Sequence, residues 1–95
     1  MLEPNPANIK KEREKARQLR KSTWWQNLIR NKAKCYYCQK SLEHNETTMD
    51  HIVPVSRGGS SSKGNIVISC KECNNLKKDL TPVEWTLYLD KLAKQ

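Results

Sequence analysis

The sequence predicts a small α+β protein stapled by a zinc site of four cysteines. Three observations predict this: the chain has 95 residues, its cysteines form two C-x-x-C pairs, and helix-forming segments flank a middle stretch rich in turn residues. A chain this short buries too little apolar surface to be comfortably stable without an added staple. The predicted organisation is a basic helical extension at residues 1–33, a cysteine-containing core at 34–79 and an amphipathic helix at 80–95 that packs on the core.

The first segment is predicted to be helical. Asn5 can cap a helix that begins at Pro6, and neither Gly nor Pro interrupts the run as far as Lys34. Ser22 and Thr23 could divide this run into two helices. Basic residues recur at helical spacing, and they either grip phosphates or form an ordinary solvated face. They are Lys10, Arg13, Arg17 and Arg20.

Two adjacent indoles follow, at Trp24 and Trp25. Neighbouring side chains on a helix point roughly 100° apart, so the two rings cannot share one environment. At least one of them is expected to pack in the core, and the other could stack on a partner.

The cysteine pairs, "CYYC" and "CKEC", are separated by 31 residues. Four thiolates match the tetrahedral coordination of structural zinc. The predicted ligands are Cys35, Cys38, Cys70 and Cys73. A site with four protein ligands leaves no position for water, so this zinc is expected to stabilise the fold without taking part in catalysis.

The charge balance, 18 Lys and Arg against 10 Asp and Glu, gives a net charge of +8. Such a charge suits a polyanionic partner, either nucleic acid or an anionic membrane surface. No segment is apolar enough to span a bilayer, and the charged first twenty residues offer no secretory signal. We therefore expect a protein of the reducing cytoplasm that binds nucleic acid and not membrane, and there paired cysteines hold metal more often than they form disulfides.

The middle stretch is predicted to contain a strand at 47–53, a turn-rich loop at 54–64, a second strand at 65–69 and a helix in "CKECNNLKKD". Thr81, Pro82 and Glu84 then form a capping-box pattern that predicts a last helix ending near Lys94. Its apolar residues are expected in the core: Val83 and Leu87, with Trp85, Leu89 and Leu92 as further candidates.

The segment "DHIVPVSRGG", together with Asn65 and "CKECNNLKKD", resembles the HNH nuclease family over about residues 35–79. The resemblance implies a ββα-metal fold with one catalytic metal ion. It also implies that His51 is the general base, that Asn65 is the central Asn, and that Asp50 and Asn74 bind the catalytic ion. Asn74 stands where the family's name has its last His, and other members of the family accept Asn there.

The chemistry of these residues agrees with those roles. Imidazole titrates near neutral pH, so His51 is suited to activating water. Oxygen ligands from Asp50 and Asn74 favour Mg²⁺ or Mn²⁺ over softer ions. Asn65 is expected to tie the Gly-rich loop to the strand that bears His51, and Gly58 and Gly59 to supply tight turning. Flanking phosphates or plain solvent are equally reasonable surroundings for three more cations: Arg57, Lys63 and Lys77.

The function predicted from the sequence is a metal-dependent HNH endonuclease, and the family resemblance implies DNA as substrate with 5′-phosphate and 3′-hydroxyl ends as products. Two alternatives stay open: a non-catalytic zinc module that binds nucleic acid through charge, and a zinc-stabilised domain whose basic helix meets an acidic protein. The sequence leaves open the target and the oligomeric state, including a homodimer that would cut both strands.

Overall fold

The computed structural model describes residues 5–94, and in that part of the chain it confirms the α+β class. Residues 1–4 and 95, the ends of the predicted first and last segments, lie outside the described residues. The described residues form two strands, four α-helices and three short 3₁₀ helices: α1 (Pro6–Arg20), α2 (Thr23–Arg30), η1 (His44–Glu46), β1 (Thr47–His51), η2 (Val55–Arg57), η3 (Lys63–Asn65), β2 (Ile66–Cys70), α3 (Lys71–Lys77) and α4 (Pro82–Ala93).

The two strands form an antiparallel pair in which Thr47 lies opposite Cys70 and His51 lies opposite Ile66. Cys70 and His51 therefore occupy opposite ends of the ladder. β1 is shorter than predicted, because the chain leaves the strand after His51 and turns at Pro54, which has no N–H to donate.

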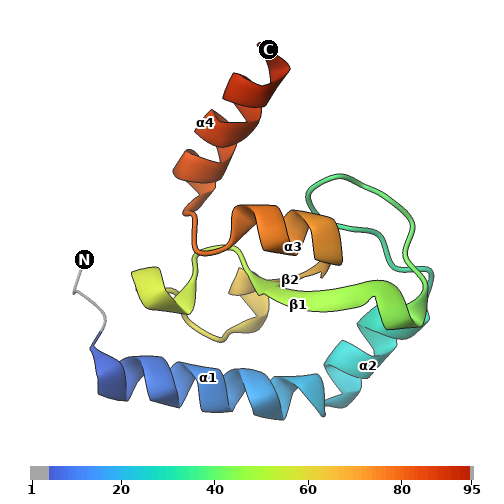
Figure 1. Cartoon of the computed structure of the whole chain (residues 1–95). Helices are drawn as coiled ribbons and strands as arrows, with labels where there is room; N and C mark the ends of the chain where they lie inside the picture. The colour runs from blue at the N-terminus through green and yellow to red at the C-terminus, as the bar shows by residue number, and fades with distance from the viewer. Residues whose placement is uncertain (1–4, 95) are drawn as a thin grey trace.

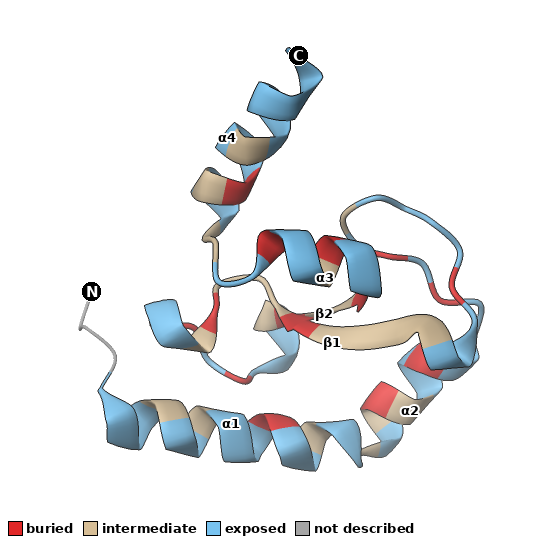
Figure 2. Ribbon diagram, viewed as in Figure 1, coloured by how far each residue is buried: buried red, intermediate tan, exposed pale blue. Residues whose placement is uncertain are grey.

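Helices lie on both sides of this strand pair (Figure 1): α3 is on one side, and α1 and α2 are on the other. The side of α1 that faces the strands carries its buried and half-buried residues, while the opposite side is exposed (Figure 2). Trp25 and Ile29 of α2 pack against Ile66 of β2, and this cluster forms one part of the core. The other part gathers around Cys35, Leu42 and the start of α3.

The helix starts follow the predicted caps. Asn5 accepts a hydrogen bond from the Asn8 backbone N–H at 2.9 Å, and α1 begins at Pro6. Ser22 caps α2, so the predicted division of the run into two helices is confirmed. Trp25 is buried and Trp24 is half-buried, which confirms that one indole packs in the core.

The last helix has the predicted capping box, formed by Thr81 and Glu84, but its apolar face does not pack on the core. Val83 is 70% exposed and Leu87 60% exposed, and Leu89 and Leu92 are exposed as well; only Trp85 is buried. The prediction that these residues pack in the core is therefore confirmed for Trp85 and wrong for the other four.

The cause lies in the turn between α3 and α4. Lys78 has a φ of 49°, and this left-handed residue redirects the chain so that α4 projects away from the body (Figure 1). The base of α4 is held by Trp85, whose ring packs edge-on against the Tyr37 ring with 5.7 Å between ring centres, and by an ion pair of Glu84 with Arg57. None of the helices within residues 5–94 is long and apolar enough to cross a membrane.

Candidate functional site

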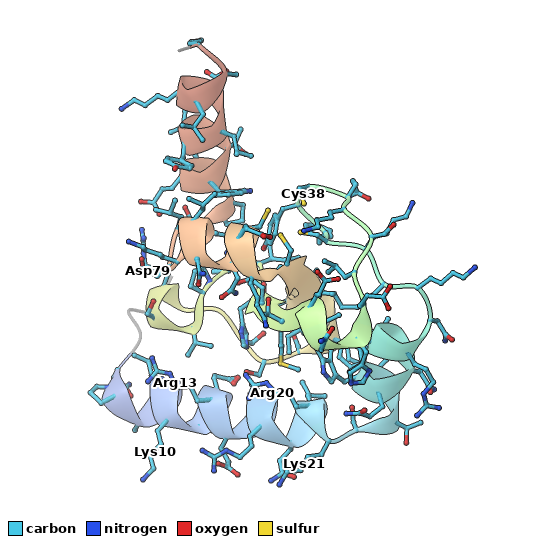
Figure 3. All side chains as sticks on the ribbon, turned by 45° about the vertical axis from the view of Figure 1, so that its right-hand side comes forward. Lys10, Arg13, Arg20, Lys21, Cys38 and Asp79 are labelled. Atoms are coloured by element: carbon cyan, nitrogen blue, oxygen red, sulfur yellow. The ribbon has the colours of Figure 1, made fainter. Side chains whose placement is uncertain are left out.

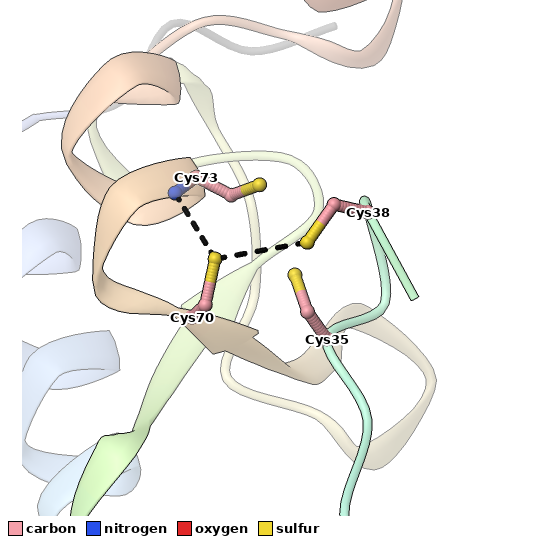
Figure 4. A group of neighbouring side chains, drawn as sticks. All are labelled: Cys35, Cys38, Cys70 and Cys73. Atoms are coloured by element: carbon pink, nitrogen blue, oxygen red, sulfur yellow. Dashed lines mark hydrogen bonds between the residues drawn. The ribbon is translucent and has the colours of Figure 1, made fainter. Parts of the chain in front are cut away.

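The four cysteines come together at the start of α3 (Figure 4). Their Sγ atoms all lie within 4.8 Å of one another, and those of Cys38 and Cys70 are 3.9 Å apart. Tetrahedral zinc with Zn–S bonds of about 2.3 Å requires sulfur atoms about 3.8 Å apart. The donor set therefore fits zinc in both chemistry and spacing. Cys70 also caps α3 by accepting a hydrogen bond from the Cys73 backbone N–H at 3.3 Å.

The thiols of the cluster differ in acidity. Burial alone would raise the pKa of Cys35, but backbone hydrogen bonds from Cys38, Cys70 and Tyr37 outweigh it and lower this pKa to about 7. Burial raises the pKa of Cys70 and of Cys73. The cluster thus favours one thiolate before the others, and a bound divalent cation would supply the charge that stabilises all four as thiolates.

Asp50, near the end of β1, is buried within a shell of proton donors. Its Oδ1 accepts a hydrogen bond from the Asn74 side-chain amide at 3.2 Å, and its Oδ2 accepts one from the Tyr37 hydroxyl. Burial raises the pKa of Tyr37, and the carboxylate of Asp50 raises it further. The structure therefore brings Asp50 and Asn74 together, with Tyr37 holding the carboxylate from the cysteine side.

The position of Lys77 differs from the one predicted from the sequence. It was predicted to contact phosphate or solvent, but it is fully buried, and its Nζ lies 3.3 Å from Asp50 Oδ2 and donates to the His51 carbonyl oxygen at 3.1 Å. The reason is the helix spacing: Lys77 follows Asn74 by three residues, so both point from α3 toward β1. Lys77 is thus an internal counter-charge for Asp50 and not a phosphate contact.

His51 is the last residue of β1, and its Nε2 lies 2.9 Å from the Ser61 hydroxyl oxygen. Burial lowers the pKa of His51 below its ordinary value, and the nearby charge of Arg20 lowers it further, whereas Asp50 opposes the shift. An imidazole with an ordinary pKa of about 6.5 is already mostly neutral at pH 7, so the lowered value keeps His51 in the form that can accept a proton.

Asn65 makes the contacts that the sequence predicted for a brace. Its Oδ1 accepts from the Val53 backbone N–H at 2.9 Å, and its Nδ2 donates to the Val53 carbonyl at 3.0 Å and to the Ser60 carbonyl at 2.8 Å. The glycines turn the chain: Gly58 has a φ of 94°, and a Cβ on Gly59 would lie 1.7 Å from the Val53 carbonyl oxygen. The loop is thereby tied to the strand that bears His51.

A pocket of about 410 Å³ lies between α1 and this end of β1. Asp50 and His51 line it on one side, and three arginines of α1 line it on the other: Arg13, Arg17 and Arg20. Figure 3 shows that Arg13 and Arg20 project from the side of α1 that faces the body, whereas Lys10 and Lys21 project from its opposite side. Asn74 contacts Asp50 but does not line this pocket.

The other two cations predicted to contact phosphate have partners within the chain. Arg57 forms an ion pair of 2.8 Å with Glu84 at the start of α4, and its phosphate contact stays a prediction. Lys63 is exposed, with its Nζ 5.6 Å from the centre of the Trp24 ring, and its phosphate contact stays a prediction.

Three residues of the site were missed at the sequence level: Glu12, Tyr37 and Ser61. A signal existed for Glu12, since it falls on the stripe of α1 that also carries Ile9 and Ala16, where a carboxylate is out of place. The sequence gives no comparable signal for Ser61, which is one of three consecutive serines.

Comparison with known proteins identifies the family of this chain. A family model described as HNH endonuclease matches residues 35–86, more than half of the chain. The CRISPR-associated endonuclease Cas9 of Corynebacterium diphtheriae is 31% identical over 62 residues, which cover 64% of this chain and 6% of that protein. The Cas9 of Actinomyces naeslundii is 35% identical over 52 residues, covering 54% of this chain and 5% of that protein. The chain thus spans about one-twentieth of these relatives, and by its family match it belongs to the HNH endonucleases.

Proposed function

We propose that the protein is a metal-dependent endonuclease that hydrolyses phosphodiester bonds in DNA. The observation that carries the proposal is the pocket in which Asp50 and His51 face the three arginines of α1. An acid and a neutral imidazole on one wall can act on water, while guanidinium groups on the other wall can bind the phosphates of a strand. Membership of the HNH endonucleases supports the same reaction class.

His51 acts as the general base. Its lowered pKa leaves the imidazole neutral at pH 7, so it can take a proton from the water that attacks phosphorus. One bond forms, from the water oxygen to phosphorus, and one breaks, from phosphorus to the 3′ oxygen. The 3′ oxygen leaves and takes up a proton, which gives the expected 5′-phosphate and 3′-hydroxyl ends. A positioned base contributes about 10²- to 10⁴-fold to such a rate.

Asp50 and Asn74 are the residues that would hold a catalytic Mg²⁺ or Mn²⁺. Their side chains lie 3.2 Å apart, and rotating the Asn74 amide would present its oxygen beside the carboxylate. Two oxygen donors on rigid elements suit a hard cation. When bound, the ion supplies Lewis-acid stabilisation of the charge that develops on the leaving oxygen. The buried ammonium of Lys77 lies 3.3 Å from Asp50 Oδ2 and provides a counter-charge in this position.

The nucleic-acid contact is assigned to the arginine wall of the pocket and to the net charge of +8. These groups attract a phosphate backbone without reading its sequence. We place the reaction in a reducing cytoplasm, because the four cysteines are free thiols poised for metal.

The test is cleavage of supercoiled plasmid by zinc-replete protein with Mg²⁺ or Mn²⁺. Wild type should nick the plasmid, and His51→Ala should be slower by about 10²- to 10⁴-fold. His44→Ala is the matched control, since His44 is exposed and does not line the pocket, and it should cleave like wild type. Retardation of the plasmid in a gel without strand breaks would instead favour the non-catalytic binding module.

Asn74→Ala should remain folded and cleave slowly, because it removes a side chain that contacts Asp50 but no apolar packing. Raising the concentration of Mg²⁺ should recover part of its rate. Cleavage by Asn74→Ala at the wild-type rate and the same metal concentration would remove Asn74 from the ion site.

A further inference from the structure

Ser61 joins His51 to α1. The serine is 8% exposed, and its hydroxyl oxygen lies 2.9 Å from His51 Nε2 on one side. On the other side the hydroxyl donates a hydrogen bond to the backbone carbonyl of Glu12. The Ser61 backbone N–H also donates to Glu12 Oε1, at 3.3 Å. Ser61 is thus held by a residue that lies outside the segment matched to the family.

These contacts determine which ring nitrogen of His51 carries the proton. A serine hydroxyl has one proton to donate, and a carbonyl oxygen can only accept. The Ser61 proton therefore points to Glu12, so the bond between Ser61 and His51 requires a proton on Nε2. In a neutral imidazole the other nitrogen, Nδ1, is then unprotonated and basic.

We propose that Ser61, held by Glu12, is a positioning residue that fixes His51 in the Nε2–H tautomer and makes Nδ1 the atom that accepts the proton from water. The catalytic role of this arrangement rests on the proposed nuclease function, whereas the tautomer itself does not. In the described part of the chain Nδ1 has no hydrogen-bond partner, and His51 lines the pocket.

The surroundings of Ser61 show that it differs from its neighbours. Ser60 and Ser62 are exposed, and their hydroxyl groups bond to each other at 2.9 Å. Ser61 alone of the three is turned inward, and the Asn65 bond to the Ser60 carbonyl fixes the loop beside it. Glu12 brings a carboxylate oxygen, Oε2, into a buried position where it has no hydrogen-bond partner among the described residues. Burying such an atom is unfavourable, so the packing of α1 on the loop must offset this cost.

The arrangement also suits the protonated state of the base. When Nδ1 takes a proton, Nε2–H remains bonded to the Ser61 oxygen, and the bond gains charge assistance from the imidazolium. No rearrangement of Ser61 or Glu12 is needed during the transfer. Helix α1 therefore has two roles in the pocket: it supplies the arginines, and through this contact it helps to orient His51.

The direct test is nitrogen NMR of the histidine rings in the zinc-replete full chain, which has only two histidines. His51 should show one N–H nitrogen, Nε2, and one unprotonated nitrogen, Nδ1, whereas exposed His44 should show a solvent-averaged mixture. In Ser61→Ala the His51 signals should shift toward a mixture. A wild-type His51 with its proton on Nδ1, or a pattern unchanged in Ser61→Ala, would overturn the proposal.

Cleavage kinetics provide the second test. Ser61→Ala should lower kcat on the order of 10- to 10³-fold while leaving KM for DNA unchanged, because it misorients the base without touching the arginines. Ser61→Thr retains the hydroxyl and should recover most of kcat, and Ser62→Ala is the control that should behave like wild type. Equal loss in Ser61→Ala and Ser61→Thr would contradict the positioning role. If wild type cleaves nothing, the proposed function fails, while the NMR measurement still decides the tautomer.

Discussion

The cysteine cluster and the Asp50–His51 pocket lie at opposite ends of the same pair of strands, and they are built in different ways. The cluster uses four identical side chains that arrive as two local pairs. The pocket combines an acid and an imidazole with three arginines from a distant segment of the chain, and the acid is paired outside the pocket with the buried ammonium of Lys77. A site made of local pairs is specified by spacing alone, whereas the pocket exists only after the helices have docked.

Helix α3 connects the two sites. Cys73 belongs to the cluster, while Asn74 and Lys77 contact Asp50. A helix of seven residues is too short to be stable by itself, so its position depends on packing and on the zinc site that anchors its first turn. Substitutions that disrupt the cysteine cluster should therefore also disrupt the pocket, whereas substitutions in the pocket should leave the cluster intact.

The largest effect is expected for Cys38→Ser. Structural zinc supplies about 10–16 kcal/mol in small zinc-dependent domains, which equals or exceeds the stability of about 5–15 kcal/mol of an ordinary domain. The variant should lose bound zinc, cooperative thermal unfolding and cleavage together, as measured by metal content, circular dichroism and plasmid nicking. Equal melting temperatures for wild type and Cys38→Ser would show that the cluster does not stabilise the fold.

The second effect concerns the buried pair of Lys77 and Asp50. Lys77→Met leaves the Asp50 carboxylate buried without its ammonium, and breaking a buried pair in this way costs about 3–5 kcal/mol. Lys78→Met is the matched control, because the adjacent lysine is exposed and should change stability by about 0.5 kcal/mol or less. Urea denaturation of zinc-replete protein measures both. Adding Asp50→Asn to Lys77→Met should recover stability, and failure to do so would point to lost packing.

The first two predictions separate what the sequence reveals from what it does not. The cysteine pairs and the helix caps were predictable because each depends on spacing along a few residues. The Asn65 brace, whose partner Val53 is 12 residues away, was predictable only beside the family resemblance. The burial of Lys77 was not predictable, because a lysine at this spacing can equally well face solvent. Only the docking of α3 on β1 determines that its side chain is buried. The same holds for Tyr37 and Ser61, whose partners are 13 and 10 residues away. In α4 the apolar pattern was read correctly, but the turn at Lys78 directs it into solvent.

A third test addresses the loop between the strands. Gly59→Ala would place a Cβ against the Val53 carbonyl, so the loop must shift, at a cost of about 1–3 kcal/mol. Gly64→Ala is the matched control, because nothing lies within 4 Å of a Cβ there. Thermal unfolding should separate the two variants, and Gly59→Ala should also lose the contact of His51 with Ser61 while retaining zinc. Equal stability of the two variants would show that the loop tolerates displacement.

The smallest effect is expected for single charges on α1, and it tests whether the pocket or the whole surface binds DNA. Arg13→Gln and Arg20→Gln each remove a cation that lines the pocket, whereas Lys10→Gln and Lys21→Gln remove one from the opposite side of the same helix (Figure 3). Each lost phosphate contact reduces the slope of log K against log salt concentration by about 0.9. Fluorescence anisotropy with a short DNA duplex, without divalent metal, should show this reduction for the arginine variants alone. Arg17 is a poorer probe, because it pairs with Glu14 at 3.4 Å. An equal reduction in all four variants would mean that DNA binding depends on the total charge and not on the position of each cation. The arginines that line the pocket would then have no special role in guiding the strand to His51.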